Sequence, residues 1–99
     1  MHCDFEWDPR KAAQNVAKHA VSFELASTVF RDSNALSIYD ATHSSEEDRW
    51  LTLGFGLNGM LLVVHHTFVQ LDEHTALIRV ISARKATARE QRQYMEQAP

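Results

Sequence analysis

The sequence contains little of what defines several large protein classes. Its 99 residues include one cysteine, Cys3, which excludes an internal disulfide framework. The longest apolar run, Met60–Val64, is far too short to cross a bilayer, so no membrane contact is predicted. The first residues lack the apolar core of a secretion signal. These absences favour a protein of the cytoplasm.

Common catalytic and metal-binding motifs are missing as well. The chain has no G-x-S-x-G motif, no phosphate-binding P-loop and no dinucleotide-binding fingerprint. Two of its histidines, His65 and His66, are adjacent, and adjacent residues of a strand point to opposite faces of a sheet. We therefore predict neither a metal site nor a cofactor.

Charge is distributed unevenly along the chain. The formal net charge is −3, but the residues from Arg79 onward hold five cations and two carboxylates, a local charge of +3 that leaves −6 on the first 78 residues. A basic region can concentrate an anionic partner in spite of an unfavourable total charge. The C-terminal part of the chain is thus the first place to expect an anion site.

Capping residues predict three helices. Asp8 can cap a helix that starts at Pro9, and Ser22 can cap a second helix. Thr87 and Glu90 have the spacing of a capping box, which predicts the start of a C-terminal helix.

The first helix is expected to bury a stripe of small apolar residues. This stripe comprises Ala12, Ala13, Val16, Ala17 and Ala20. Another face of the same helix carries Lys11, Asn15 and Lys18, which we expect to be solvated.

The middle of the chain predicts a meander of about four strands, with a possible short extra strand at residues 5–7. Alternating or continuous apolar residues place the four strands at 35–40, 49–55, 60–68 and 75–82. Asn58-Gly59 is typical of a two-residue hairpin turn. Helices segregated from a mostly antiparallel sheet make this an α+β fold, with the sheet covered on one face.

Two cations lie at an electrostatically unfavourable place, the junction between the last strand and the C-terminal helix. Arg84 and Lys85 precede the positive end of a helix dipole, which disfavours cations locally. Either a bound anion or an ion pair with an acidic side chain from the first helices would relieve this. Arg79 has the opposite parity to Arg84, so the two side chains point apart unless the strand bends near Ala83.

His19 ends the first predicted helix and has two interpretations. It can simply interact with the negative end of the helix dipole. As an accessible imidazole beside Lys18, it can also transfer protons.

Three segments, in this order, resemble the BrnT family of toxins from bacterial type II toxin–antitoxin modules. They are F-x-W-D-P-x-K-A-x-x-N-x-x-K-H from Phe5, "HSSEEDRWLTLG" from His43, and "LIRVISARKATAREQRQY" ending at Tyr94. The resemblance implies a single toxin domain over residues 1–99 with a RelE-like fold. It also implies ribonuclease activity that inhibits translation and growth.

The same resemblance implies partners. RNA would be the substrate, and a BrnA-type antitoxin would neutralise the toxin in a heterotetramer. That antitoxin would carry the complex to operator DNA and so repress the operon.

The resemblance also implies site residues for a metal-independent ribonuclease, in which the ribose 2′-OH attacks the adjacent phosphate. Arg84 matches the arginine of the family's S-A-R motif and is the first candidate to stabilise the transition state, with Arg79 second. His19 is the candidate acid or base, and Tyr94 contributes its hydroxyl or only packs. The residues expected to contact the flanking RNA backbone are Lys11, Lys18, Lys85 and Arg89.

Two positions depart from the family pattern. Ala20 stands where the family usually has glycine, and Val69 stands where it often has arginine. With the net negative charge, they motivate a second hypothesis: a catalytically weak or inactive module of the same fold that binds an antitoxin and regulates its operon.

Overall fold

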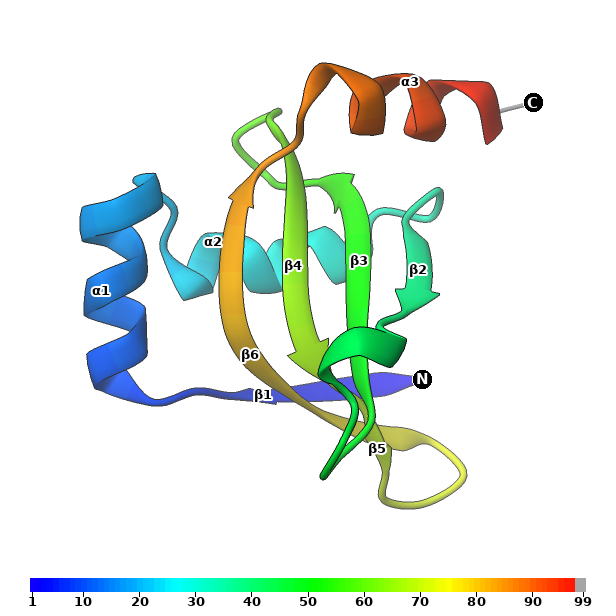
Figure 1. Ribbon diagram of the computed structural model, residues 1–99. Coiled ribbons are helices and arrows are strands. Elements are labelled where there is room, and N and C mark those ends of the chain that lie inside the picture. Colours follow the sequence, from blue (N-terminus) through cyan, green and yellow to red (C-terminus); the bar gives the residue numbers. More distant parts are fainter. Residues whose placement is uncertain (98–99) are drawn as a thin grey trace.

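The computed structural model describes residues 1–97, which form an α+β fold (Figure 1). The helices of this range are α1 (Pro9–His19), α2 (Phe23–Ser27) and α3 (Ala88–Gln97), with 3₁₀ turns η1 (Thr28–Arg31) and η2 (Ala41–His43). The strands are β1 (His2–Glu6), β2 (Leu36–Tyr39), β3 (Arg49–Phe55), β4 (Leu61–Thr67), β5 (Val69–Gln70) and β6 (Thr75–Lys85).

The strands form one mixed sheet. Its order is β1-β6-β4-β3-β2, and the short β5 pairs with β6. The pairs β2–β3, β3–β4, β4–β6 and β5–β6 are antiparallel, whereas β1 runs parallel to β6. The predicted antiparallel meander is therefore confirmed, and an N-terminal strand is present, but it spans His2–Glu6 rather than the predicted residues 5–7. β5 was not predicted, because a strand of two residues leaves no recognisable pattern in the sequence.

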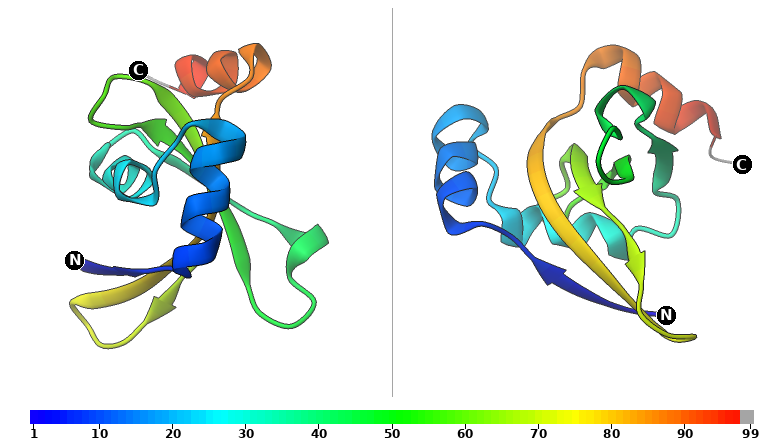
Figure 2. Two further views of the ribbon diagram at one scale, coloured as in Figure 1. Left: turned by 90° about the vertical axis from the view of Figure 1, so that its left-hand side faces the viewer. Right: turned by 60° about the horizontal axis from the view of Figure 1, so that its bottom comes forward.

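The two faces of the sheet are covered to different extents. The main core lies on the face toward α1 and α2, the core face, and comprises Val21, Phe23, Ala26, Val29, Leu62, Val64, Val80 and Ala83. On the opposite face, the open face, α3 covers a smaller cluster of Leu53, Leu61, Val63 and Tyr94. Figure 2 shows α2 and the segment around η2 on opposite sides of the sheet. The part of the open face beyond α3 is not covered by α1 or α2.

The ends of α1 form as the sequence predicts. The Asp8 carboxylate accepts a hydrogen bond from the Arg10 backbone N–H at 2.8 Å, and Pro9 occupies the first turn. At the other end Ala20 has φ 57° and ψ 31°, the left-handed conformation, and its N–H donates to the Val16 carbonyl. An alanine thus stands where glycine would be unstrained.

The predicted apolar stripe of α1 is wrong except at Ala12, which packs against the core. Val16 is 50% exposed, and the buried residue of the helix is Asn15. Asn15 Nδ2 donates to the carbonyls of Val21 (2.8 Å) and Ala83 (2.9 Å), and its Oδ1 accepts from the Ala83 N–H (3.1 Å). Because β1 pairs with β6 only as far as Arg79, this amide acts as the strand partner farther along β6. A polar residue is therefore buried because it satisfies backbone groups of a sheet edge.

β6 is longer than predicted and contains a β-bulge. The strand continues past residue 82 to Lys85, so Arg84 lies within it rather than in a turn. His65 pairs with Ser82 and His66 pairs with Val80, which leaves Ile81 as the extra residue. The bulge reverses the alternation of faces, and Val80 and Ala83 both point into the core. Arg79 and Arg84 consequently lie on the same, open face.

The hairpin between β3 and β4 is not the predicted two-residue turn. The Gly59 N–H donates to the Gly56 carbonyl at 3.0 Å, so Leu57 and Asn58 are the central residues. Gly59, with φ +79°, follows them in the left-handed region. This is the longer class of hairpin loop, a turn followed by a left-handed residue, in which Asn58 keeps negative φ.

Candidate functional site

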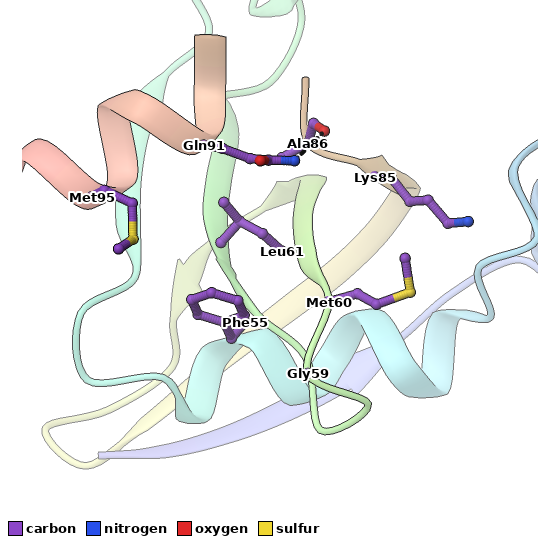
Figure 3. A pocket seen from close by; sticks show the side chains of 8 residues that line it. All are labelled: Phe55, Gly59, Met60, Leu61, Lys85, Ala86, Gln91 and Met95. Atoms are coloured by element: carbon purple, nitrogen blue, oxygen red, sulfur yellow. Dashed lines mark hydrogen bonds between the residues drawn. The ribbon is translucent and has the colours of Figure 1, made fainter. Parts of the chain in front are cut away.

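The open face carries a cavity beside the segment that joins β2 to β3. Its volume is about 270 Å³, and its lining consists of Asp40, His43, Arg49, His65, Ile81 and Ser82. A larger groove of about 570 Å³ lies between the β3–β4 hairpin and α3 (Figure 3). That groove is lined mainly by apolar side chains such as Phe55, Leu61 and Met95, with Lys85 at its rim. The charged groups that suit chemistry on an anion gather around the smaller cavity.

Arg84 is held by a carboxylate from α3. Its Nη1 and Nη2 donate to Glu90 Oε1 and Oε2 at 2.7 and 2.9 Å, a two-pronged ion pair. Glu90 also accepts from the Thr87 N–H at 2.8 Å, and its own N–H donates to Thr87 Oγ1 at 3.2 Å. The predicted capping box is thus confirmed. The hydrogen bond from Arg84 holds the pKa of Glu90 well below its usual range, at about 2.

This ion pair decides between the two interpretations of the junction. Arg84 does pair with an acidic side chain, but the partner belongs to α3 and not to the first helices. The pair occupies two of the five N–H groups of the guanidinium. A further N–H, on Nη1, donates to the Lys85 carbonyl at 3.4 Å, so the Nε–H and the second N–H of Nη2 remain for a second anion.

His65 lies on the open face within reach of the field of Arg84. Burial lowers the pKa of its imidazole, and the positive charge of Arg84 lowers it further. Both effects favour the neutral ring near pH 7, which is the form that accepts a proton. Nearby, His43 Nδ1 lies 2.8 Å from Asp40 Oδ2 and borders the same cavity.

A second group of charges lies at the other end of this face. The Glu47 carboxylate oxygen Oε1 accepts hydrogen bonds from Arg49 Nη2, at 3.3 Å, and from Arg79 Nη2. One carboxylate therefore bridges two guanidinium groups that come from β3 and β6.

Comparison with models of protein families identifies the family of this chain. The model of BrnT, the ribonuclease toxin of a type II toxin–antitoxin system, matches residues 7–90. The chain belongs to the BrnT family of ribonuclease toxins. No curated protein sequence matches it.

The fold agrees with that membership. The crystal structure of the Brucella abortus ribonuclease toxin BrnT superposes with a TM-score of 0.61 and 21% sequence identity, over 88% of this chain and 99% of that one. At this level of identity the similarity speaks for the shared fold. Within residues 1–97, no helix is both long and apolar enough to span a bilayer.

The predicted site residues of this BrnT-family chain do not all meet. Arg79 and Arg84 share the open face with the cavity, whereas His19 ends α1, which lies beside the edge of β6 (Figure 1). The predicted RNA-contacting residues are all exposed and lie on three different elements: Lys11 and Lys18 on α1, Lys85 at the end of β6, and Arg89 on α3.

Tyr94 is a packing residue in this arrangement. Its side chain is buried, its ring contacts Phe55 edge-on, and its hydroxyl donates to Asp32 Oδ2 at 2.6 Å. Burial and the Asp32 carboxylate raise the pKa of the phenol to about 12. Of the two roles expected for Tyr94, the geometry supports packing, since the hydroxyl is committed to anchoring α3.

His66 demonstrates that the two adjacent histidines have separate roles. It is 2% exposed on the core face, where Nδ1 lies 2.9 Å from the Thr67 carbonyl and Nε2 lies 2.6 Å from Thr52 Oγ1. Because a carbonyl only accepts, Nδ1 carries the proton and Nε2 accepts from the hydroxyl. This satisfied imidazole is structural, and His65 is the one that faces the cavity.

Sequence reasoning did not select the residues that complete this site, namely Asp40, His43, Glu47, Arg49 and His65. Their contacts are long-range: Glu47 meets Arg79 across 32 residues of sequence. The available signal was the opposite orientation of His65 and His66. That signal could not place His65 beside Arg84, because it does not give the register of β4 against β6. Among residues 1–97, no three His, Cys, Asp or Glu side chains are grouped to hold a metal ion.

Proposed function

We propose that this toxin cleaves RNA on the open face of its sheet by attack of the ribose 2′-OH on the adjacent phosphate, without a metal ion. The observation that carries the proposal is that Arg84 and His65 lie on one face beside a cavity, and that the bulge at Ile81 brings Arg79 to the same face. A cyclising ribonuclease needs no protein nucleophile. It needs a base, a proton donor and a cation at the phosphate.

The residues at the cavity supply these groups. Neutral His65 takes the proton of the 2′-OH while the bond from O2′ to phosphorus forms. The bond from phosphorus to O5′ then breaks, giving a 2′,3′-cyclic phosphate, and the leaving O5′ takes a proton from His43. Arg84 stabilises the charge that develops on the phosphate oxygens. Glu90 binds the two terminal nitrogens of the guanidinium, Nη1 and Nη2, and this leaves the side that carries the Nε–H for a phosphate.

The remaining predicted residues have secondary places in this proposal. His19 stays a candidate acid or base that competes with His65, and Tyr94 acts by holding α3. The flanking RNA backbone would be contacted by Lys11, Lys18, Lys85 and Arg89. We further propose that residues 1–99 act as one RelE-like domain in the cytoplasm. There, a BrnA-type antitoxin would neutralise it as a heterotetramer that binds operator DNA through the antitoxin.

The second candidate function is a weak or inactive module that binds the antitoxin and regulates its operon. Val69 supports it, because this position on β5 is 51% exposed and offers an apolar side chain where a cation would meet RNA. The strained backbone of Ala20 supports it as well. Ala20 directly follows His19, a candidate acid or base, so strain at this position would affect where the imidazole lies.

Induced expression and RNA cleavage by purified protein separate the two candidates. Wild type should arrest growth and cleave RNA in chelator. Arg84→Ala should lower the cleavage rate by at least about 10²–10³-fold, the usual loss when one hydrogen-bond donor to the transition-state charge is removed. Exposed Arg92→Ala is the matched control and should retain activity. Soluble wild type that neither arrests growth nor cleaves RNA would favour the binding module.

The pH dependence identifies the base. A base must be neutral to act, so the kcat/KM of wild type should fall with acid through a pKa below about 6.5. His65→Ala should remove most activity together with this acid limb, while the exposed His74→Ala should change neither. Loss of the limb in His19→Ala instead would return the role to His19.

A further inference from the structure

The Glu47 side chain sits between two arginines on the face assigned to RNA. We propose that Arg49 and Arg79 form a second phosphate-binding position, which Glu47 occupies until a phosphodiester of single-stranded RNA replaces its carboxylate. This inference rests on the proposed function, because the phosphate belongs to a nucleotide that flanks the cleaved bond.

The contacts leave the two guanidinium groups incompletely satisfied. Both ion pairs use the same carboxylate oxygen, Oε1 of Glu47. Among residues 1–97, the buried Nε of Arg49 has no hydrogen-bond acceptor. Within these two ion pairs, two cations share one carboxylate. A phosphodiester has two non-bridging oxygens and several lone pairs, so it can accept from more of these N–H groups than the single oxygen of Glu47 does.

This position is separate from the one at Arg84. Arg84 faces Glu90 of α3, whereas Arg79 faces Glu47 in the segment that joins β2 to β3. Because one of the five intervening steps of strand is taken up by the bulge, their Cα atoms are about 13 Å apart. His65, which pairs with Ser82 on β6, lies between them along the strand. One RNA strand lying along β6 would therefore place different phosphates at the two positions, with the imidazole between them.

Glu47 can leave without unfolding its segment. Its side chain is 37% exposed, so the displaced carboxylate would enter water. The base of the segment is tied independently, because the Arg49 N–H donates to Ser44 Oγ at 3.0 Å and the Asp40 N–H donates to the Arg49 carbonyl at 2.8 Å. Glu47 is thus a replaceable counter-ion, and exchanging it for phosphate keeps the arginines paired in both states.

Binding of a non-cleavable RNA tests this assignment. The probe is a fluorescein-labelled single-stranded 10-mer with 2′-O-methyl riboses, which lacks the attacking hydroxyl and so reports binding alone. Glu47→Gln should tighten binding by about three- to tenfold, the range for releasing two exposed ion pairs. Glu46→Gln is the matched control, because it makes the same change of charge one residue away. It should alter affinity by less than about 1.5-fold.

Arg49 variants complete the cycle. Arg49→Gln should weaken binding and remove most of the gain from Glu47→Gln in the double variant. Arg49→Lys, which keeps the charge but loses the fork, should recover only part of the affinity. Thermal unfolding of each variant verifies that the fold is intact. Equal effects of Glu47→Gln and Glu46→Gln, or full affinity in Arg49→Gln, would overturn the inference.

The two proposals fail separately. If the Glu47 gain is present but wild type does not cleave RNA, the phosphate position stands and the cleavage proposal falls. If wild type cleaves RNA through Arg84 but Glu47→Gln gains nothing, the reverse holds.

Discussion

At the scale of single residues, Ala20 has a cost that can be measured. Its left-handed conformation, φ 57°, ends α1 and is disfavoured for any residue with a Cβ. Ala20→Gly should therefore raise the free energy of unfolding by about 1 kcal/mol, because the relief of strain exceeds the extra entropy of the unfolded chain. Urea unfolding followed by circular dichroism measures this difference.

The same substitution elsewhere in α1 is the control. Ala17 is exposed inside the helix, where glycine costs about 1 kcal/mol, so Ala17→Gly should destabilise. Opposite signs for the two variants are expected from backbone conformation alone. Destabilisation by both would mean that the left-handed residue is not strained. Reduced RNA cleavage by Ala20→Gly would show that the position of His19 matters.

Site residues were predictable where their contacts are local. Thr87 and Glu90 lie three residues apart, and their capping box follows from sequence spacing. Arg84 was identifiable as a candidate anion-binding residue because it stands beside a helix start. His65 was not selected, because its place beside Arg84 depends on the register of β4 against β6, and the face of Arg79 depends in addition on a one-residue bulge in β6. Periodicity of two gives neither the register nor such an insertion before the partner strand is known.

At the scale of elements, the position of α1 depends on one polar side chain. Asn15 bonds both backbone groups of Ala83 and the carbonyl of Val21, and so joins the helix to the edge of β6. The helix pattern suggested the reverse, a buried stripe of alanines with Asn15 in water. Helix caps are local and were predicted correctly. Which face is buried depends on what the helix meets, and here it meets unpaired strand backbone.

Truncation of this amide should be costly. Asn15→Ala would leave one buried N–H and two carbonyls without partners, so we expect a loss of about 2–4 kcal/mol in the free energy of unfolding. Gln14→Ala, at the exposed neighbouring position, should change stability by less than about 0.5 kcal/mol. Denaturant unfolding gives both values, and hydrogen exchange at the Ala83 amide should accelerate only in Asn15→Ala. An Asn15→Ala variant as stable as wild type would mean that water replaces the amide at no cost.

At the scale of the whole molecule, the function depends on where the charges lie rather than on the net charge. The chain carries −3 overall, yet Arg49, Arg79 and Arg84 lie on one face of the sheet. Exposed charges farther apart than about 8 Å are largely screened at physiological salt. The fold class and the basic C-terminal region were predictable from composition and pattern. The gathering of these arginines was not, because Arg49 comes from a strand 30 residues away from Arg79.

The salt dependence of RNA binding tests whether this local gathering governs affinity. The two phosphate positions on this face should together contribute about −1.4 to the slope of log K against log salt, since each phosphate neutralised on a single strand contributes about −0.7. Fluorescence polarisation with the 2′-O-methyl 10-mer between 50 and 300 mM salt measures it. Arg84→Gln and Arg49→Gln should each make the slope shallower by up to about 0.7, whereas the control Arg92→Gln on α3 should leave it unchanged.

Glu73→Gln, in the exposed turn before β6, makes the same change of net charge as Glu47→Gln but should not alter affinity at 150 mM salt. A steep slope that responds equally to every arginine would instead mean that diffuse basicity binds RNA, because only site-bound phosphates make the slope depend on which cation is removed.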